Sequence, residues 1–498
     1  MEPLKRESGI LLHISSLPGK YGIGALSRDA FQFIDFLKAA GQSDWQILPI
    51  GPTGYGDSPY QSCSIYAGNP YFIDLDALLA EGLLEAEDLA GIDWGSPERV
   101  DYAALYASRI PLLERAYARG RALRRAEFAA FRAANPWVED YALFTALKQH
   151  FGMLPWSQWP EKAAARDPEA LARYREELQE DIACCAFLQY LFYEQWDKLA
   201  AYARAQGIKI IGDIPIYVSM DSCDVWLHPE LFQLDAARCP TQVAGCPPDG
   251  FSEDGQLWGN PLYDWPRHAA TGFAWWQDRI RAAARFFDVI RIDHFRGLES
   301  YWAVPYGDET ARNGRWVKGP GMQLIRALRD GVPGVTFIAE DLGFLTPEVE
   351  QLLADSGLPG MKVLEFAFYG GDSAYLPHNH VVNSVCYTGT HDNMTLAQWL
   401  ETESAETVDR AVKYLGLNRE EGYIRGMLRA GMCSVSRRFI SQLQDWLELG
   451  AEARMNAPGE QNSNNWSWRL TELPGAALAA EILEMTRLYA RTGEQTHA

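Results

Sequence analysis

The stretch Asp288-Val-Ile-Arg-Ile-Asp-His-Phe-Arg-Gly297 decides the fold, because it has the pattern of a buried strand that ends in charged residues. Successive side chains of a strand point to opposite faces. Arg291 and Asp293 therefore share one face. Ile290 and Ile292 share the other. A guanidinium and a carboxylate on a buried face are costly unless each is paired, so this pair is either a structural ion pair or part of a functional site.

Several other runs have strand character and are separated by helical patterns. They span 9–17, 44–50, 208–218, 335–342, 361–366, 384–393 and, weakly, 450–456. Strands that alternate with helices form parallel sheets. Together with the opening stretch they make eight, which predicts an α/β fold of the (β/α)8 TIM barrel type.

The chain has 498 residues, far more than the about 250 of a simple barrel. We therefore predict a single catalytic barrel domain, 1–498, with two insertions. Residues 74–206 are rich in Ala, Arg, Glu and Leu with helical periodicity, which predicts a helical insertion between the second and third strands. Residues 219–286 are rich in Gly, Pro and acidic residues, which predicts an irregular, lid-bearing insertion between the third and fourth strands.

Composition limits the partners. A net charge of −21 disfavours nucleic acid and anionic membranes, which both select a basic surface. No apolar run is long enough to cross a membrane, and the N-terminus does not resemble a signal peptide. The 8 cysteines form no Cys-x-x-Cys pair, which favours reduced thiols and a cytoplasmic location. The oligomeric state is not specified by these features.

Three carboxylates, Asp293, Glu340 and Asp392, follow three of the predicted strands. In a parallel barrel the C-terminal ends of all strands meet at one mouth, so these groups should lie close together. Breaking an acetal needs one carboxylic acid to protonate the leaving oxygen and one carboxylate to attack or stabilise the anomeric carbon. Convergent carboxylates therefore favour glycoside chemistry over a structural ion pair.

The neighbours of these carboxylates suggest their roles. Arg291 should keep Asp293 ionised, as a nucleophile must be. Glu340 follows apolar strand residues, which suits a proton donor. His391 and Asp392 could grip sugar hydroxyls. The usual metal-binding spacings are absent, so we expect no metal and no cofactor.

The sequence resembles the 4-α-glucanotransferases of glycoside hydrolase family 77, called amylomaltases or disproportionating enzymes, which are relatives of the α-amylases. The resemblance extends essentially from end to end. It rests on the motifs Asp44-Trp-Gln-Ile-Leu-Pro, Gly54-Tyr-Gly-Asp-Ser-Pro-Tyr60, Gly212-Asp-Ile-Pro-Ile-Tyr-Val218, Phe251-Ser-Glu-Asp-Gly-Gln-Leu-Trp-Gly-Asn-Pro-Leu-Tyr263, Arg291-Ile-Asp-His-Phe-Arg-Gly297, Ala339-Glu-Asp-Leu-Gly343, Gly389-Thr-His-Asp-Asn393 and Arg454-Met-Asn-Ala-Pro-Gly459.

The resemblance implies Asp293 as nucleophile, Glu340 as acid/base and Asp392 as transition-state stabiliser. It also implies further sugar contacts: Tyr60, Asp213, Arg291 and His391 in the cleavage subsite, Gln256 and Trp258 in an acceptor-side lid, Asn465 near a sugar, and Tyr55 and Tyr102 on a second glucan-binding surface. Gly250 stands where some members carry a tyrosine in the lid.

The implied reaction is double displacement with retention, in which a segment of an α-1,4-glucan passes to the 4-hydroxyl of another glucan or of glucose through a glucosyl ester. Retention predicts that the carboxyls of Asp293 and Glu340 lie roughly 5–5.5 Å apart. An α-amylase-like hydrolase with the same carboxylates is an alternative. A non-catalytic glucan-binding protein is another, and the 74–206 region alone could serve as a scaffold.

Overall fold

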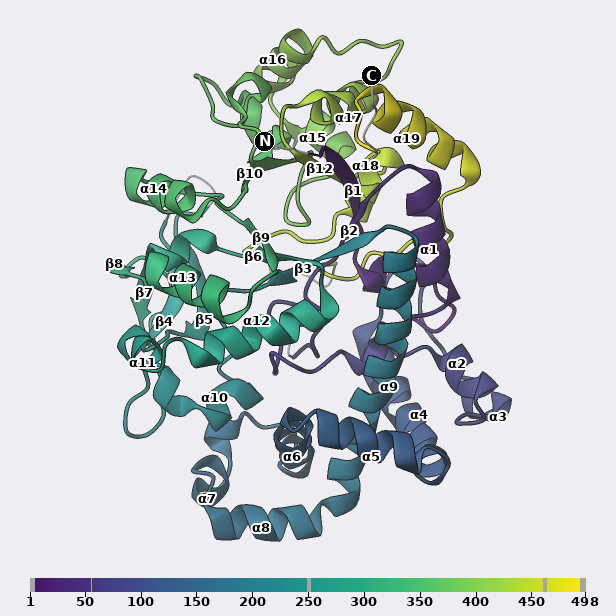
Figure 1. Cartoon of the computed structure of the whole chain (residues 1–498), viewed down its shortest axis with the longest axis vertical. Helices are drawn as coiled ribbons and strands as arrows, with labels where there is room; N and C mark the ends of the chain where they lie inside the picture. The colour runs from purple at the N-terminus through teal and green to yellow at the C-terminus, as the bar shows by residue number, and fades with distance from the viewer. Residues whose placement is uncertain (1–4, 55, 249–251, 460–463, 493–498) are drawn as a thin grey trace.

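The computed structural model describes residues 5–54, 56–248, 252–459 and 464–492; Tyr55 and Gly250 lie outside them. Its centre is a sheet of eight parallel strands in the order β10-β11-β12-β1-β2-β3-β6-β9 (Figure 1). The strands are β1 (Glu7–Leu11), β2 (Asp44–Gln46), β3 (Lys209–Ile214), β6 (Val289–Ile292), β9 (Thr336–Ala339), β10 (Gly360–Val363), β11 (Ser384–Tyr387) and β12 (Arg438–Gln442). The (β/α)8 TIM barrel is thereby confirmed.

The alternation within β6 separates two layers of core. Val289 packs inside the barrel with Ile338 of β9 and Tyr387 of β11. Ile290 and Ile292 belong to the larger apolar cluster outside the barrel, with the covering helices. Since Arg291 and Asp293 continue the inner face, the strand delivers both charged groups to the barrel interior and its mouth.

The eighth strand is not the predicted 450–456. It is β12 (Arg438–Gln442), while Ala451–Ala453 forms a 3-10 helix. A buried arginine hides the strand pattern of β12. Arg438 is paired with Glu7 of the adjacent strand β1 and with Asp44 of β2, the next strand beyond β1. Because its charge is satisfied by residues distant in sequence, the strand tolerates it.

Residues 75–205, between β2 and β3, form helices that extend below the barrel in Figure 1. The last of them runs back up to the barrel and ends shortly before β3. These helices are α2 (Leu75–Ala80), α3 (Ala86–Leu89), α4 (Tyr102–Leu123), α5 (Arg125–Ala134), α6 (Trp137–His150), α7 (Glu161–Ala164), α8 (Pro168–Glu177) and α9 (Gln179–Ala205).

The region after β3 is more regular than predicted, because it contributes to a second sheet. This antiparallel sheet has the order β5-β4-β7-β8, and its strands are β4 (Gln242–Cys246), β5 (Gln256–Pro261), β7 (Ser300–Pro305) and β8 (Arg315–Lys318). Two strands come before β6 and two after it, so the sheet joins parts of two loops. Trp258 therefore lies on a strand and not on an irregular loop.

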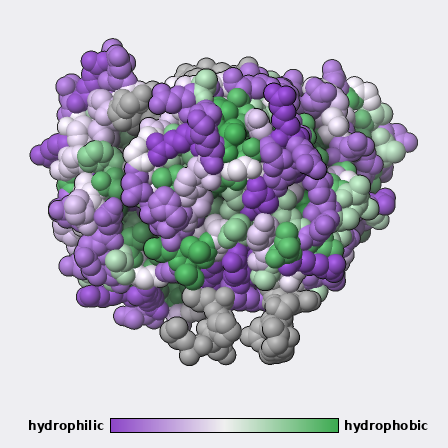
Figure 2. Space-filling model, turned by 90° about the horizontal axis from the view of Figure 1, so that it is seen from above, coloured by the Kyte–Doolittle hydropathy of each residue, from purple (hydrophilic) through white to green (hydrophobic). Residues whose placement is uncertain are grey.

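The remaining helices mostly cover the barrel; α19 packs beside α1, and Thr492 beyond it forms an isolated bridge with Glu7 of β1. They are α1 (Arg28–Ala39), α10 (Cys223–Leu227), α11 (Trp265–Ala270), α12 (Ala274–Phe286), α13 (Met322–Gly331), α14 (Pro347–Ser356), α15 (Leu396–Thr402), α16 (Ala405–Leu415), α17 (Tyr423–Cys433), α18 (Leu443–Trp446) and α19 (Ala476–Leu488). The face in Figure 2 is mostly hydrophilic with separate apolar patches. Within the described ranges, no helix is long and apolar enough to cross a membrane.

Candidate active site

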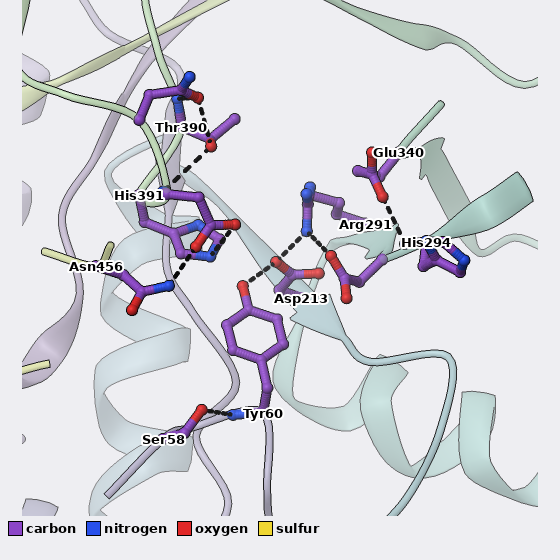
Figure 3. A network of polar contacts seen from close by, with 12 residues as sticks. Ser58, Tyr60, Asp213, Arg291, His294, Glu340, Thr390, His391 and Asn456 are labelled. Carbon is purple, nitrogen blue, oxygen red and sulfur yellow. Dashed lines mark hydrogen bonds and ion pairs between the residues drawn. The ribbon is translucent and has the colours of Figure 1, made fainter. Parts of the chain in front are cut away.

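Arg291 lies at the centre of a polar network at the barrel mouth (Figure 3). Strand β6 pairs with β3 in the register that sets Arg291 opposite Asp213. Nη1 of Arg291 donates to Oδ2 of Asp213 at 2.5 Å and to Oδ1 of Asp293 at 3.0 Å. Tyr60 donates its hydroxyl to the same oxygen of Asp213 at 2.7 Å. The side chain of Asp213 is fully buried, whereas 27% of the Asp293 side chain is exposed, so Asp293 is the carboxylate of this network that a ligand can reach.

Burial governs the titration of both aspartates. It raises the pKa of Asp293 above that of an ordinary carboxyl, and the Arg291 guanidinium opposes that rise. Burial likewise raises the pKa of Asp213 to about 7. Arg291 thus favours the ionised form of Asp293, as expected from the sequence, but desolvation is the larger influence.

Glu340 follows β9 and is held by backbone N–H groups. The N–H of His294 donates to its Oε2 and that of Leu342 donates to its Oε1, both at 2.7 Å. His294 reaches this position with a left-handed backbone, φ 52°, directly after Asp293. Glu340 is only 8% exposed, and burial raises its pKa to about 8, with the nearby charge of Asp293 adding to the rise. A carboxyl that keeps its proton at neutral pH beside one that a ligand can reach is the arrangement of an acid and a nucleophile.

Asp392 lies in the loop after β11 and is held by two residues of the segment that follows Ala451–Ala453. Nδ2 of Asn456 donates to its Oδ1 at 2.6 Å, and Nη2 of Arg454 donates to its backbone oxygen at 2.9 Å. Nε2 of His391 lies 3.3 Å from its Oδ2. Since 39% of its side chain is exposed, Asp392 faces the open site.

Three rings form one wall of the site. The rings of Tyr60 and His391 stack with centroids 5.2 Å apart and planes 15° apart. Trp466 lies against both, at 5.8 and 5.9 Å. Burial lowers the pKa of His391, so its imidazole is neutral at physiological pH and can both donate and accept hydrogen bonds.

The lid candidates lie on β5. The indole N–H of Trp258 donates to Oε1 of Gln256 at 3.2 Å. The ring of Trp258 meets that of His294 edge to face, with centroids 4.8 Å apart. Trp258 therefore packs on the side chain of the residue that directly follows Asp293 and whose backbone N–H binds Glu340.

The other predicted residues lie further out. Oδ1 of Asn465 accepts from the N–H of Ala457 at 3.0 Å. Tyr102, at the start of α4, donates its hydroxyl to the backbone oxygen of Trp466 at 2.9 Å. Tyr102 is thus tied to the aromatic wall, and its proposed partner Tyr55 falls outside the described residues.

Sequence reasoning missed several members of the site. Asn456 and Arg454 were seen only as part of a motif, without a role, and Trp466 carried no signal. The motif Arg454-Met-Asn456 itself is the available clue, because both side chains carry N–H donors that can bind a carboxylate or a carbonyl oxygen. Within the ranges that the structure describes, no group of three or more His, Cys, Asp or Glu side chains is arranged to hold a metal ion.

The chain has clear relatives. Residues 12–474 match a family model described as 4-alpha-glucanotransferase. A protein from Thermus thermophilus named 4-alpha-glucanotransferase is 49% identical over 485 residues, which cover 95% of this chain and 96% of that protein. One of the same name from Clostridium butyricum is 48% identical over 487 residues, 96% of this chain and 100% of its own. The solved structure of an amylomaltase from Streptococcus agalactiae in complex with acarbose superimposes with a TM-score of 0.95 at 43% identity, covering 98% of this chain and 100% of that one.

Proposed function

This chain belongs to the 4-alpha-glucanotransferases of glycoside hydrolase family 77, and we propose that it moves a segment of an α-1,4-glucan to the 4-hydroxyl of another glucan or of glucose. The donors are maltooligosaccharides, starch or glycogen. The names of its relatives support transfer over the simple hydrolysis of an α-amylase.

In the first half of the reaction, a carboxylate oxygen of Asp293 attacks the anomeric carbon as the bond from that carbon to the leaving 4-oxygen breaks. Glu340 gives its proton to the leaving oxygen. The products are a glucosyl ester of Asp293 and a shortened glucan. The observation that carries these roles is a buried Glu340, held by the N–H groups of His294 and Leu342, near an Asp293 that is partly exposed to ligand. Burial raises the pKa of Glu340 to about 8, which favours the protonated carboxyl at neutral pH.

In the second half, the 4-hydroxyl of an acceptor loses its proton to Glu340 and attacks the same carbon, and the ester bond to Asp293 breaks. Two inversions give retention. Asp392 stabilises the positive charge that develops on the sugar ring. Tyr60, Arg291 and His391 orient the sugar at the cleavage point, and Asp213 holds two of them, Tyr60 and Arg291, in place.

Transfer requires that an acceptor sugar outcompetes water, by binding energy and by exclusion of water. We assign this task to the lid residues Gln256 and Trp258, together with Asn465. Tyr102 and Tyr55 form a second glucan contact in this proposal. The regions 74–206 and 219–286 act as insertions of one catalytic domain, and the scattered cysteines, with no Cys-x-x-Cys pair, fit a cytoplasmic enzyme of carbohydrate metabolism.

Incubation with maltotriose tests the proposed function. A transferase produces glucose and longer glucans while the number of reducing ends stays nearly constant. A rising number of reducing ends would instead identify the α-amylase-like hydrolase. An Asp293→Asn variant should form no products, and unchanged product formation in it would favour a glucan-binding protein whose apparent activity comes from a contaminant.

A further inference from the structure

Among the described strands of the barrel, β9 and β10 are neighbours that share no ladder of backbone hydrogen bonds. Strands β9 and β10 stand at the two ends of the strand order, and yet they lie next to each other. The N–H of Ala339 donates to the oxygen of Pro359 at 2.9 Å, just before β10. Beyond Ala339, at the barrel mouth, a side-chain oxygen accepts the hydrogen bond from β10 that a backbone oxygen of β9 would accept in a regular ladder.

That side chain is Asp341, the residue after Glu340. Its Oδ1 accepts a hydrogen bond from the N–H of Met361 on β10 at 2.6 Å. Asp341 is only 4% exposed, so it is shielded from competing water. The carboxylate also lies directly over Gly360, since a methyl group added there would come within 2.6 Å of Oδ2 of Asp341. The position of the Asp341 carboxylate therefore requires a residue without a side chain at 360.

Without this contact, Glu340 would be hydrogen-bonded towards β6 but residues 340–342 would have no hydrogen bond to β10 in the described part of the chain. On the β6 side, the N–H of Glu340 donates to Ile292 at 3.0 Å, its backbone oxygen accepts from Phe295 at 3.0 Å, and its Oε2 accepts from His294 at 2.7 Å. On the β10 side, the bond between Asp341 and Met361 is the one hydrogen bond in the described part of the chain that fixes residues 340–342 to β10.

We propose that Asp341 is a positioning residue for Glu340: by replacing the missing ladder bond between β9 and β10, it fixes the proton-donating carboxyl against the barrel mouth. This inference rests on the proposed function, in which Glu340 is the acid/base. Met361 also contacts Arg291, whose Nε lies 3.5 Å from the sulfur of Met361. Displacement of Met361 would therefore disturb Glu340 through Asp341 and Asp293 through Arg291.

The test uses three variants of the whole chain. Asp341→Ala removes the acceptor, Asp341→Asn keeps an acceptor oxygen, and Gly360→Ala pushes the intact carboxylate away. For Asp341→Ala and Gly360→Ala we expect kcat to fall about 10-fold or more with KM within about 2-fold, because small misplacements of a catalytic group are costly. Asp341→Asn should stay within about 3-fold of the wild type. The kcat and KM values come from glucose release from maltotriose.

The pH dependence of kcat/KM distinguishes a positioning role of Asp341 from a role in stability alone. When residues 340–342 loosen, water reaches Glu340 and its pKa falls back from about 8 towards the ordinary value of 4.5. The alkaline limb of kcat/KM should therefore move to lower pH by at least about half a unit in Asp341→Ala, and the Asn variant should restore it.

The matched control is Asp288→Ala. Asp288 makes the same kind of bond at the opposite end of the barrel, where its Oδ2 accepts from the N–H of Ile210 at 3.0 Å. It should lower the melting temperature but leave the pH profile unchanged. An unshifted limb in both Asp341→Ala and Gly360→Ala, with an active wild type, overturns this inference alone. A wild type without transfer activity overturns the proposed function instead. Should Asp341→Ala not fold, Gly360→Ala and Asp341→Asn still decide the question.

Discussion

Asn456 donates its side-chain amide to Oδ1 of Asp392 at 2.6 Å, across the gap between the loops that follow β12 and β11. Asn456 is 8% exposed, and a hydrogen bond from a buried amide to a carboxylate is charge-assisted. Arg454 holds the backbone of the same aspartate and also binds the backbone oxygen of Asn456 at 2.8 Å. The orientation of Asp392 therefore depends on a loop 64 residues further along the chain.

Asn456→Ala should consequently impair catalysis more than binding. Without the amide, Asp392 can rotate away from the sugar, and we expect kcat to fall about 10- to 100-fold while KM changes little. Steady-state kinetics with maltotriose measure both. Asn313→Ala is the control, because Asn313 donates to Asp308 at 3.2 Å at an exposed site. Equal kcat values for the two variants would show that Asn456 has no part in orienting Asp392.

The raised pKa of Glu340 predicts an alkaline limit of activity. The free enzyme must carry the proton on Glu340, so kcat/KM should fall about tenfold per pH unit above about 8. Glu340→Gln should lose transfer from maltotriose. It should still react with α-maltosyl fluoride, whose leaving group needs no proton. Since the variant lacks a base for the second step, fluoride should appear as a burst equal to the enzyme concentration, and the absence of a burst would contradict the assigned role.

The sequence predicted the reactive part of the site because strand periodicity has long-range consequences. Once 288–297, 335–342 and 384–393 are read as parallel strands, the barrel itself brings Asp293, Glu340 and Asp392 to one mouth. No contact between them needs to be known in advance.

The parts that the sequence did not predict depend on contacts between residues far apart in the chain, which hydrophobic periodicity does not reveal. Arg438 makes β12 look unlike a strand until Glu7 and Asp44 are seen beside it. Strands β4 and β5 precede β6 in the chain, and β7 and β8, which complete their sheet, follow it. Neither pair alone therefore shows the pattern of a four-stranded sheet. Trp466 lies in a loop, where position follows from contacts and not from a repeat.

Trp258→Ala should raise the ratio of hydrolysis to transfer. The indole covers His294 next to Asp293, and its removal opens the glucosyl ester to water. The ratio of new reducing ends to glucose released from maltotriose measures this. Trp316→Ala is a suitable control, since Trp316 lies on the same antiparallel sheet but packs on Arg296, 3.8 Å from the ring centroid. A ratio that rises equally in both variants, or in neither, would argue against a water-excluding role for Trp258.

The buried titratable groups predict how stability depends on pH. One set consists of histidines whose pKa values are lowered in the folded state. Below the ordinary histidine pKa of 6.5, the unfolded chain therefore binds more protons than the folded chain, and stability rises with pH up to about 6.5. This set is His13 and His294, each with a pKa of about 3, and His268 and His380, each of about 4. A second set has raised pKa values, so the folded chain binds more protons and stability falls with rising pH until the folded pKa is passed. This set includes Asp213, Asp224 and Asp445, each of about 7, Glu340 of about 8, and Glu365, whose pKa burial raises well above its ordinary value.

The two effects oppose each other at acid pH, but above pH 6.5 only the carboxyls remain. The free energy of unfolding should therefore decline between pH 6.5 and 8, and Glu340 alone should contribute about 2 kcal/mol of that decline at about 1.4 kcal/mol per pH unit. Urea denaturation at pH 6.5, 7, 7.5 and 8 measures it. Glu340→Gln should flatten the decline by that amount, whereas Glu350→Gln, at an exposed site on α14, should leave it unchanged. A decline that is equally steep in Glu340→Gln would show that Glu340 is ionised in the folded enzyme throughout this range, and would remove its basis as the proton donor.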